Sequence, residues 1–464
     1  MNRQLACTLG LLIGCGGGGG EGSPDAAGVD AKPEVQEWAF TAGGDSTEAG
    51  YDIAVDQAGY SYVTGYYVGE PQFGNRRLKA FGRFDLFVSK IDPDGNLVWT
   101  NGSGGKDFDF GHGIAVDSDG FVYVTGHIYD DPMFGTTQLV SHGFGDLLVA
   151  KLDPDGNYVW AVRGGGGGHD LGRDIVVDSS GNIYVIGTFQ SEATFGNDKL
   201  TTKGRDDVFV TKLNNDGSYV WTRQFGSADG DNEGYGIDVD AAGNVYISGS
   251  FGETMQFGDI SRKAAGSRDL FAAKLDSDGD VTWVYTAGGE EKERGRGIKV
   301  AADGHSYVTG SIRGTATFAT QSGDKVLTSA GSQDVITLKL SSDGQAVWVA
   351  QAGGAGEELG RALAIDDEGN SYVTGFFREK LTFGASEFQS KGDMDVFITK
   401  VSDSGDYEWA TSAGDVLLQF GRSIDVHNGK VYSTGSYERS PSFGDTQLSS
   451  EGGEDLFVWK FPAP

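Results

Sequence analysis

The chain has 464 residues, which is enough for several ordinary domains or for one large closed repeat array. Its formal net charge of −31 argues strongly against nucleic acid as a partner, because phosphate backbones are bound by clustered cations. The 76 glycines, with only 9 prolines and 11% aromatic residues, indicate many tight turns between strands rather than disorder.

The first 15 residues have the pattern of an export signal. Arg3 provides a positive charge, and residues 5–13 form a mostly apolar stretch, shorter than the roughly 20 residues of a membrane-spanning helix. Residues 12–15 read Leu-Ile-Gly-Cys and resemble the bacterial lipobox, in which the peptide is cut before a cysteine that is then lipidated. We therefore expect residues 1–14 to be a lipoprotein signal peptide and Cys15 to carry the lipid. The alternative is an ordinary signal peptide with a cysteine there by chance.

Residues 15–35 have no periodic apolar pattern and are predicted to be a Gly-rich flexible tether. The lipoprotein resemblance implies release to the outer membrane, because Gly16 rather than an aspartate follows the cysteine. We expect an exported monomer whose contact with the membrane is its N-terminal lipid anchor, at the outer membrane or surface of a bacterial cell envelope. Cys7 is the only other cysteine, so the body of the chain has no disulfide and no cysteine-based metal site.

Tryptophan marks a repeat along the rest of the chain, and a fixed period of this size indicates a repeat array. Residues 172–228 illustrate one repeat, with strands expected at 174–178, 183–187, 207–212 and 219–222 between Gly/Asp turns. Each repeat is therefore predicted to be a four-stranded antiparallel meander. The marking residues lie at intervals of 61, 61, 61, 62, 65 and 61 residues: Trp38, Trp99, Trp160, Trp221, Trp283, Trp348 and Trp409.

Other residues recur in every repeat, including a Tyr on strand two, an Asp at the start of strand three and a Lys five residues after that Asp. A single active site would not need seven copies, so we interpret the recurring Asp and Lys as structural. The two series are Asp85, Asp146, Asp207, Asp269, Asp334, Asp395 and Asp455, and Lys90, Lys151, Lys212, Lys274, Lys339, Lys400 and Lys460.

The two ends of the array complement each other. The last repeat stops after strand three at residues 455–460, whereas residues 37–41 match the fourth strand of the other repeats. One end can thus supply the strand that the other lacks, which would benefit a ring and not a linear array. We predict an all-β fold over residues 36–464: a single seven-bladed β-propeller of four-stranded antiparallel blades, closed by the N-terminal strand completing the last blade.

The wording of the repeat, G-x-x-I-A-V-D…G-x-x-Y-V-T-G…F-G…D-x-F-V-x-K-x-x-x-D-G-x-x-x-W, resembles the bacterial SBBP (seven-bladed β-propeller) repeat family over residues 37–463. Members of that family are mostly exported or surface proteins without an assigned activity. The resemblance therefore implies a fold and a location, and it assigns no catalytic residue. The fifth copy departs most, with Ala301 in place of a turn aspartate.

One position varies between repeats in an unusual way. It follows a recurring Gly just before strand one, which is the innermost strand of a blade, so it is expected at the mouth of the central channel, on the face that carries the longer loops. We predict a pocket for an anionic or carbohydrate ligand, bound by Arg forks and Tyr faces. Alternatively, each arginine pairs with a loop carboxylate and ties blades together. The candidate ligand-binding residues are Tyr51, His112, Arg173, Tyr235, Arg296, Arg361 and Arg422.

No pattern of catalytic chemistry stands out. The six histidines lack metal-ligand spacing, no G-x-S-x-G elbow with partners is present, and the glycine run at 164–168 lacks the ending of a phosphate loop. We expect no catalytic residue, metal or cofactor. Three functions stay open: a binding scaffold for a ligand or an envelope protein, using the long-loop face and channel mouth; a polysaccharide-processing or other envelope enzyme with its site at that mouth; or a purely structural envelope component.

Overall fold

The computed structural model describes residues 37–228, 230–450 and 452–464, in which every regular element is a β-strand. The all-β prediction is therefore confirmed. The predicted signal peptide, the tether and Cys15 lie outside the described residues. No helix in the described part of the chain could cross a membrane.

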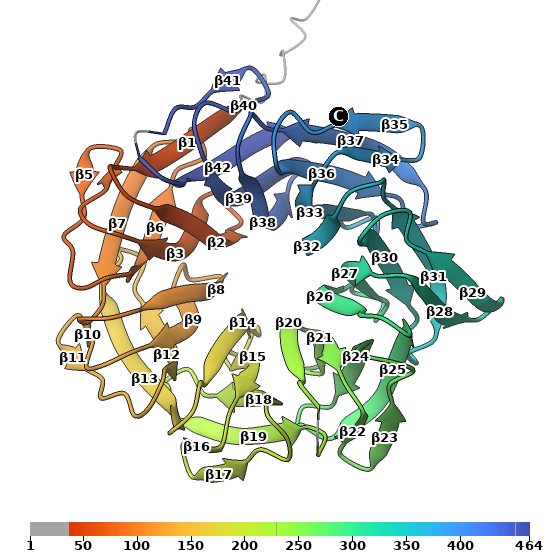
Figure 1. The fold of residues 1–464 in the computed structure, drawn as a ribbon. Coiled ribbons are helices and arrows are strands. Elements are labelled where there is room, and N and C mark those ends of the chain that lie inside the picture. The colour runs from red at the N-terminus through yellow and green to blue at the C-terminus, as the bar shows by residue number, and fades with distance from the viewer. Residues whose placement is uncertain (1–36, 229, 451) are drawn as a thin grey trace, which may run out of the picture. The chain divides into compact units, whose positions relative to one another are not determined.

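Each repeat forms an antiparallel meander of four strands, and successive meanders lie around a central space with the first strand of each innermost (Figure 1). This arrangement is propeller-like. The meanders consist of β2 (Glu48–Val55), β3 (Ser61–Tyr67), β6 (Asp85–Ile91) and β7 (Leu97–Ser103); β8 (Phe110–Val116), β9 (Val122–Ile128), β12 (Asp146–Leu152) and β13 (Tyr158–Gly166); β14 (Leu171–Val177), β15 (Ile183–Phe189), β18 (Asp207–Leu213) and β19 (Tyr219–Phe225); β20 (Glu233–Val239), β21 (Val245–Phe251), β24 (Asp269–Leu275) and β25 (Val281–Gly289); β26 (Arg294–Val300), β27 (Ser306–Ile312), β30 (Asp334–Leu340) and β31 (Ala346–Ala352); β32 (Glu358–Ile365), β33 (Ser371–Phe377), β36 (Asp395–Val401) and β37 (Tyr407–Ala413); and β38 (Gln419–His427), β39 (Lys430–Tyr437), β42 (Asp455–Pro462) and β1 (Trp38–Gly43).

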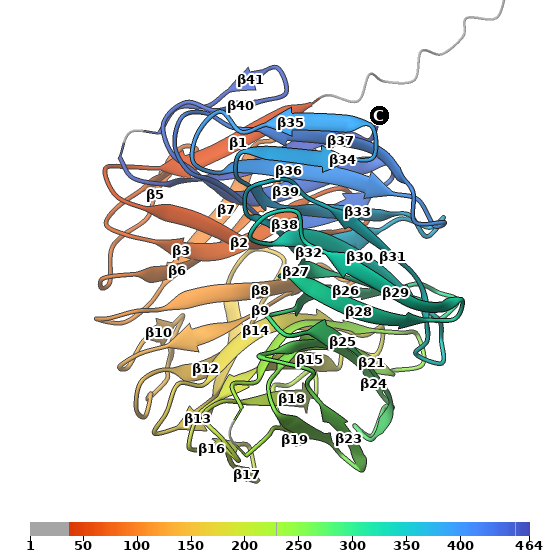
Figure 2. The ribbon, with the colours of Figure 1, turned by 45° about the vertical axis from the view of Figure 1, so that its right-hand side comes forward.

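A short hairpin interrupts each repeat between strands two and three, and it lies at the periphery in both views (Figure 1 and Figure 2). The sequence indicated only a segment with a recurring Phe-Gly there. The Gly forms the turn at positive φ, as at Gly74 (φ +52°), while Phe73 is buried against Phe87. The hairpins are β4 (Gln72–Phe73) and β5 (Arg76–Arg77), β10 (Met133–Phe134) and β11 (Thr137–Gln138), β16 (Glu192–Phe195) and β17 (Asp198–Thr201), β22 (Thr254–Phe257) and β23 (Ile260–Lys263), β28 (Thr315–Thr320) and β29 (Gly323–Thr328), β34 (Lys380–Phe383) and β35 (Ser386–Gln389), and β40 (Ser442–Phe443) and β41 (Thr446–Gln447).

The longer fifth repeat is explained by its hairpin. Its β28 and β29 have six residues each, and Ala319 stands where the other repeats have the turn glycine. The turn instead lies further out, where Gly323 has φ +114°. The longer interval between Trp283 and Trp348 is therefore an extension at the periphery, away from the central space (Figure 1).

Six of the seven recurring tryptophans join one repeat to the next. In these six, the indole N–H donates a hydrogen bond to a backbone carbonyl in the turn between strands three and four of the following repeat, and the ring lies against the glycine of that turn. A Cβ at Gly95 would lie 2.8 Å from the ring of Trp38, so only glycine fits there. The bonds are Trp38 to Pro93 (3.0 Å), Trp99 to Pro154 (3.0 Å), Trp160 to Asn215 (3.0 Å), Trp221 to Ser277 (3.3 Å), Trp283 to Ser342 (3.1 Å) and Trp348 to Asp403 (2.9 Å).

The recurring Asp, Lys and Tyr also have structural partners. Asp85 accepts hydrogen bonds from the backbone N–H groups of Phe81 (2.8 Å) and Gly82 (3.2 Å), which fixes the loop before strand three. The ammonium of Lys90 lies 5.0 Å from the ring centre of Tyr62, a cation–π contact repeated in the other blades. These contacts support the structural interpretation of the recurring residues.

Strands from the two ends of the described chain lie in one sheet, of order β38-β39-β42-β1. The pairing runs from Trp38 opposite Lys460 to Ala42 opposite Leu456, one residue beyond the stretch matched in the sequence. The last and first repeats are also linked at their inner strands, where the N–H of Val55 donates to Asp425 over 2.8 Å.

Candidate functional site

The innermost strand of every repeat carries a β-bulge at one position. An extra residue in one strand re-aims its side chain, and such bulges are common beside binding sites. The register shifts fall between Gly50 and Asp52, Gly111 and Gly113, Gly172 and Asp174, Gly234 and Gly236, Gly295 and Gly297, Gly360 and Ala362, and Gly421 and Ser423. The skipped residue is in each case one of the candidate ligand-binding residues.

The structure brings all seven candidate residues together. They line one hollow of about 120 Å³, which we call the mouth, and each is half-buried. The mouth adjoins a channel of about 300 Å³ between the innermost strands. Around the mouth, in chain order, stand Tyr51, His112, Arg173, Tyr235, Arg296, Arg361 and Arg422.

The arginines of the mouth are mostly without carboxylate partners. Among the described residues, only Arg422 has a carboxylate oxygen within 4.0 Å, that of Glu454 at 4.0 Å. The Nε–H groups of Arg173, Arg296 and Arg422 are buried, and no described atom accepts a hydrogen bond from them. The alternative in which each arginine pairs with a loop carboxylate therefore fails for three of the four.

Two arginines instead contact aromatic rings of the mouth. The guanidinium of Arg422 lies 4.5 Å from the ring centre of Tyr51, and that of Arg296 lies 4.2 Å from the ring centre of Tyr235. Cation–π contacts of this kind orient a guanidinium without neutralising its charge. The N–H groups at the edges of the guanidinium planes remain available to a ligand.

Burial and mutual repulsion lower the pKa values of two side chains of the mouth. Burial, and after it the positive charges of Arg422 and Arg296, lower the pKa of Arg361 to about 9. Burial likewise lowers the pKa of His112 well below its ordinary value, and the neighbouring His127 acts in the same direction. The two imidazoles are 2.9 Å apart, from Nε2 of His112 to Nδ1 of His127. The mouth thus concentrates positive charge that an anion would neutralise.

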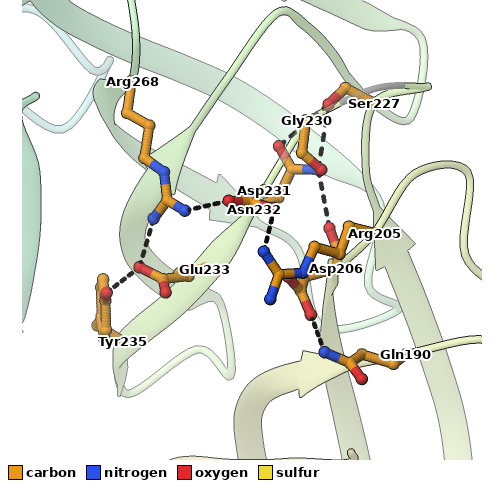
Figure 3. A network of polar contacts seen from close by, with 10 residues as sticks. All are labelled: Gln190, Arg205, Asp206, Ser227, Gly230, Asp231, Asn232, Glu233, Tyr235 and Arg268. Carbon is orange, nitrogen blue, oxygen red and sulfur yellow. Dashed lines mark hydrogen bonds and ion pairs between the residues drawn. The ribbon is translucent and has the colours of Figure 1, made fainter. Parts of the chain in front are cut away.

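Loop carboxylates near Tyr235 are bound elsewhere, as Figure 3 shows. The Tyr235 hydroxyl donates to Glu233, and Glu233 also accepts from Arg268 over 2.8 Å. Arg268 donates its second terminal nitrogen to Asp231, again over 2.8 Å. These acidic groups are therefore occupied by Arg268 and leave the arginines of the mouth unpaired.

Below the mouth, four aspartates of the innermost strands each bridge neighbouring repeats, and we call them the throat. Asp52 accepts from the N–H of Ile114 (2.7 Å), and Asp174 accepts from that of Ile237 (3.0 Å). Such charge-assisted bonds to backbone N–H groups are strong. The full set is Asp52, Asp174, Asp238 and Asp425.

Lys299 is the cation of the throat. Burial opposes its charge, but Asp238 and Asp174 outweigh this and raise the pKa of Lys299. Burial raises the pKa of all four aspartates, that of Asp52 to about 7, and the charge of Lys299 opposes this rise. The sequence did not single these residues out, although each of the four aspartates directly precedes an Ile or Val of strand one.

A group of aromatic side chains adjoins the mouth over the first two repeats. Tyr51 and His112 of the mouth have ring centres 5.1 Å apart, and Phe110 stacks on His127 at 4.9 Å. We call the group the aromatic sector; it comprises Tyr51, Tyr66, Phe84, Phe108, Phe110, His112, His127 and Tyr129. Apart from Tyr51 and His112, these residues could not be found from the sequence because they do not recur between repeats.

No group of three or more His, Asp or Glu side chains in the described ranges is arranged to hold a metal ion.

Comparisons with known proteins identify the repeat and the fold. The family model of the SBBP beta-propeller repeat matches residues 100–132, 220–250 and 347–375. An uncharacterized WD repeat-containing protein of Acanthamoeba polyphaga mimivirus is 22% identical over 415 residues, covering 73% of this chain and 30% of that protein. The regulatory protein FlaEY of Caulobacter vibrioides is 28% identical over 177 residues, covering 36% and 18%. The chain therefore spans less than a third of the length of these relatives.

Solved propellers share the architecture at low sequence identity. The structure of U3-55K matches with a TM-score of 0.50 and 10% identity, over 91% of this chain and 98% of that one. A similarity at this identity bears on the fold alone. Together with the repeat matches, it shows that the chain is a β-propeller repeat protein with a propeller-like, all-β fold.

Proposed function

We propose that residues 36–464 form a closed seven-bladed β-propeller that binds an anionic ligand at the mouth and serves as a binding scaffold of the bacterial cell envelope. The ring is supported by the pairing of β1 with β42 and by the bond from Val55 to Asp425, which link the first and last repeats. The variation of the mouth between repeats supports a binding role, because the scaffold residues around it recur unchanged.

The unpaired arginines are the observation that carries this proposal. Holding buried cations together without anions is costly, and natural structures rarely leave such groups unsatisfied. Guanidinium groups bind carboxylate and phosphate oxygens through paired N–H donors. An anion in the mouth would accept hydrogen bonds from the free Nε–H groups of Arg173, Arg296 and Arg422. It would also reduce the repulsion between the arginines, which together with burial lowers the pKa of Arg361.

Arg296→Gln combined with Arg361→Gln is expected to weaken the binding of inorganic phosphate, sulfate or acetate to the purified full chain by about 100-fold or more, as measured by calorimetry. Each charged hydrogen bond contributes roughly 1.5–3 kcal/mol, so the loss of two gives a factor of this size. Binding to the unaltered chain should also weaken as salt is raised.

The matched control is Arg76→Gln with Arg77→Gln, which removes the same charge from the exposed strand β5. This variant should bind the anions as the unaltered chain does. The anion-binding proposal is wrong if the unaltered chain binds none of the three anions, or if both double variants weaken binding equally.

We further propose that the propeller is held at the outer membrane or cell surface by a lipid on Cys15. Metabolic labelling with radioactive palmitate in a bacterial host is expected to label the full chain and the Cys7→Ser variant, and not Cys15→Ser. Cys7 is the matched control because it lies within the predicted signal peptide and would be removed with it. Label that persists in Cys15→Ser, or its absence from the unaltered chain, would contradict the anchor.

A further inference from the structure

The mouth is chemically two-sided. Arg296, Arg361 and Arg422 come from three successive repeats and form one arc, and Tyr51 and His112 of the first two repeats continue the ring from Arg422. The aromatic sector continues outward from Tyr51 and His112 without a break. Phe110 connects His112 of the mouth to Phe84 of the aromatic sector, because its ring centre lies 6.1 Å from that of His112 and 5.4 Å from that of Phe84. A ligand held at the mouth by its negative group would therefore rest its body on aromatic rings.

The rings of the aromatic sector remain accessible. Phe84, Phe108, Phe110 and Tyr129 are half-buried and belong to loops or strand ends on the face that carries the mouth. Next to them, Phe144 is 65% exposed and stacks on His169 at 5.6 Å. Aromatic groups that are clustered and yet incompletely covered mark interaction sites, because a soluble surface otherwise leaves such residues scattered.

Polar groups capable of binding hydroxyls lie at the margin of this sector. The Tyr129 hydroxyl is 3.3 Å from Nδ1 of His169, and His127 contacts both Tyr129 and Phe110 through its ring. A phenol and two imidazoles offer donors and acceptors beside flat apolar faces. Sugars present the complementary pattern, with C–H groups on one face of the ring and hydroxyls at its edge. Aromatic surfaces with a few polar groups are typical of sites for such small ligands.

The size of the mouth limits the acidic group of the ligand. Asp52 and Asp174 directly follow Tyr51 and Arg173 in the chain, so buried carboxyl groups lie immediately beneath two residues of the mouth. A single carboxylate can occupy the roughly 120 Å³ mouth and accept hydrogen bonds from the arginines.

We propose that the mouth and the aromatic sector form one composite site for a carboxylated saccharide, a uronic-acid unit of an acidic glycan. The uronate carboxylate binds the arc of Arg296, Arg361 and Arg422, and the face of the sugar ring packs on the aromatic sector. The inference rests on the proposed anion-binding function and adds the class of ligand to it.

Calorimetry with trigalacturonate, its neutral counterpart galactotriose, and acetate tests the composite site on the purified full chain. Trigalacturonate is expected to bind at least about tenfold more tightly than acetate, and galactotriose at least about tenfold more weakly than trigalacturonate. Phe108→Ala and Phe144→Ala should each weaken trigalacturonate binding about fivefold and leave acetate binding unchanged, since only the sugar ring contacts these side chains. Arg361→Gln should weaken both charged probes.

Phe81→Ala is the matched control, because Phe81 is 44% exposed and contacts no other aromatic ring among the described residues, whereas Phe144 is joined to the aromatic sector through His169, whose ring contacts Tyr129. Thermal unfolding checks that Phe108→Ala is folded, and Phe144→Ala provides the same test at an exposed position. Trigalacturonate that binds no more tightly than acetate, or unchanged binding in both phenylalanine variants, overturns the composite site while acetate binding still supports the anion-binding mouth. Tighter, phenylalanine-dependent binding of a nucleoside monophosphate overturns the saccharide assignment. Failure of acetate and the other simple anions to bind contradicts the proposed function itself.

Discussion

A chain that lacks residues 37–43 is expected to lose its cooperative thermal unfolding transition and to aggregate during purification. These residues include β1, which pairs with β42 over five residue positions and buries Trp38, Phe40 and Ala42 in the core. Burial of a large apolar side chain stabilises a fold by roughly 1.5–3 kcal/mol, whereas a whole domain is stable by only about 5–15 kcal/mol. The deletion also exposes the edge of β42 as a template for association with other chains.

Circular dichroism during heating and size-exclusion chromatography measure the two consequences. A synthetic peptide of residues 36–44, added during refolding, should restore the transition, because the strand would then be supplied from outside the chain.

A milder pair of variants provides the matched control. Trp38 donates its indole N–H to Pro93 over 3.0 Å, whereas the buried Nε1 of Trp409 has no acceptor among the described residues. Trp38→Phe should therefore reduce the free energy of unfolding by about 1 kcal/mol more than Trp409→Phe. A cooperative, monomeric deletion variant would contradict the role of β1.

The repeat made most of the fold predictable. Trp38 and Trp99 are 61 residues apart because each indole must reach the same turn of the next repeat, so the period in sequence reflects a contact in space. The short hairpins could not be predicted as strands. In β4 and β5, two residues per strand leave no alternation of apolar and polar positions to detect.

The candidate site was predictable in position but not in its electrostatics. The recurring Gly before strand one places the variable residue at the bulge in every repeat, so membership of the mouth follows from the repeat alone. Whether Arg296 pairs with a carboxylate depends on the conformation of the neighbouring loops, which the repeat does not determine. In the structure, Arg268 forms the ion pairs with Asp231 and Glu233. The aromatic sector combines Phe84, Phe110 and other residues from different repeats that do not recur, so the repeat pattern does not indicate it.

Buried carboxyl groups at the first residue of strand one, or directly before it, predict a second large effect, on how stability depends on pH. Four of the five carboxyl groups accept a hydrogen bond from a backbone N–H four residues earlier, as Glu358 does from Gly354 over 3.0 Å. Two repeats have an amide there instead. Asn232 donates its Nδ2 to Asp207 over 3.5 Å, which is the kind of bond that a protonated carboxyl can also make. The carboxyl positions are Glu48, Asp109, Asp170, Glu293 and Glu358, and the amide positions are Asn232 and Gln419.

Burial raises the pKa of Glu358 to about 8, with the neighbouring Asp334 acting in the same direction and the bond from Gly354 against it. Burial raises the pKa of Glu48 to about 8, and that of Glu293 to about 7. Since the unfolded chain releases these protons near pH 4.5, the neutral forms favour the folded state fully below that pH. Their contribution is lost progressively as the pH rises from about 4.5 to about 8. We therefore expect the free energy of unfolding to be lower at pH 9 than at pH 5.

Glu358→Gln is expected to stabilise the protein at pH 9 relative to the unaltered chain, by more than it does at pH 5. Each unit of pKa shift corresponds to about 1.4 kcal/mol, so the difference between the two pH values should exceed 1 kcal/mol in urea titrations.

Gln419→Glu is the reciprocal variant. Gln419 donates from Nε2 to the carbonyl of Glu438 (3.4 Å), and a glutamate can do so only while protonated, so this change should increase the loss of stability at pH 9. Glu387→Gln, at an exposed ion pair with Lys380, should alter neither value appreciably. Equal effects of Glu358→Gln at the two pH values would mean that the carboxyl is ionised in the folded protein, and that the buried position tolerates its charge.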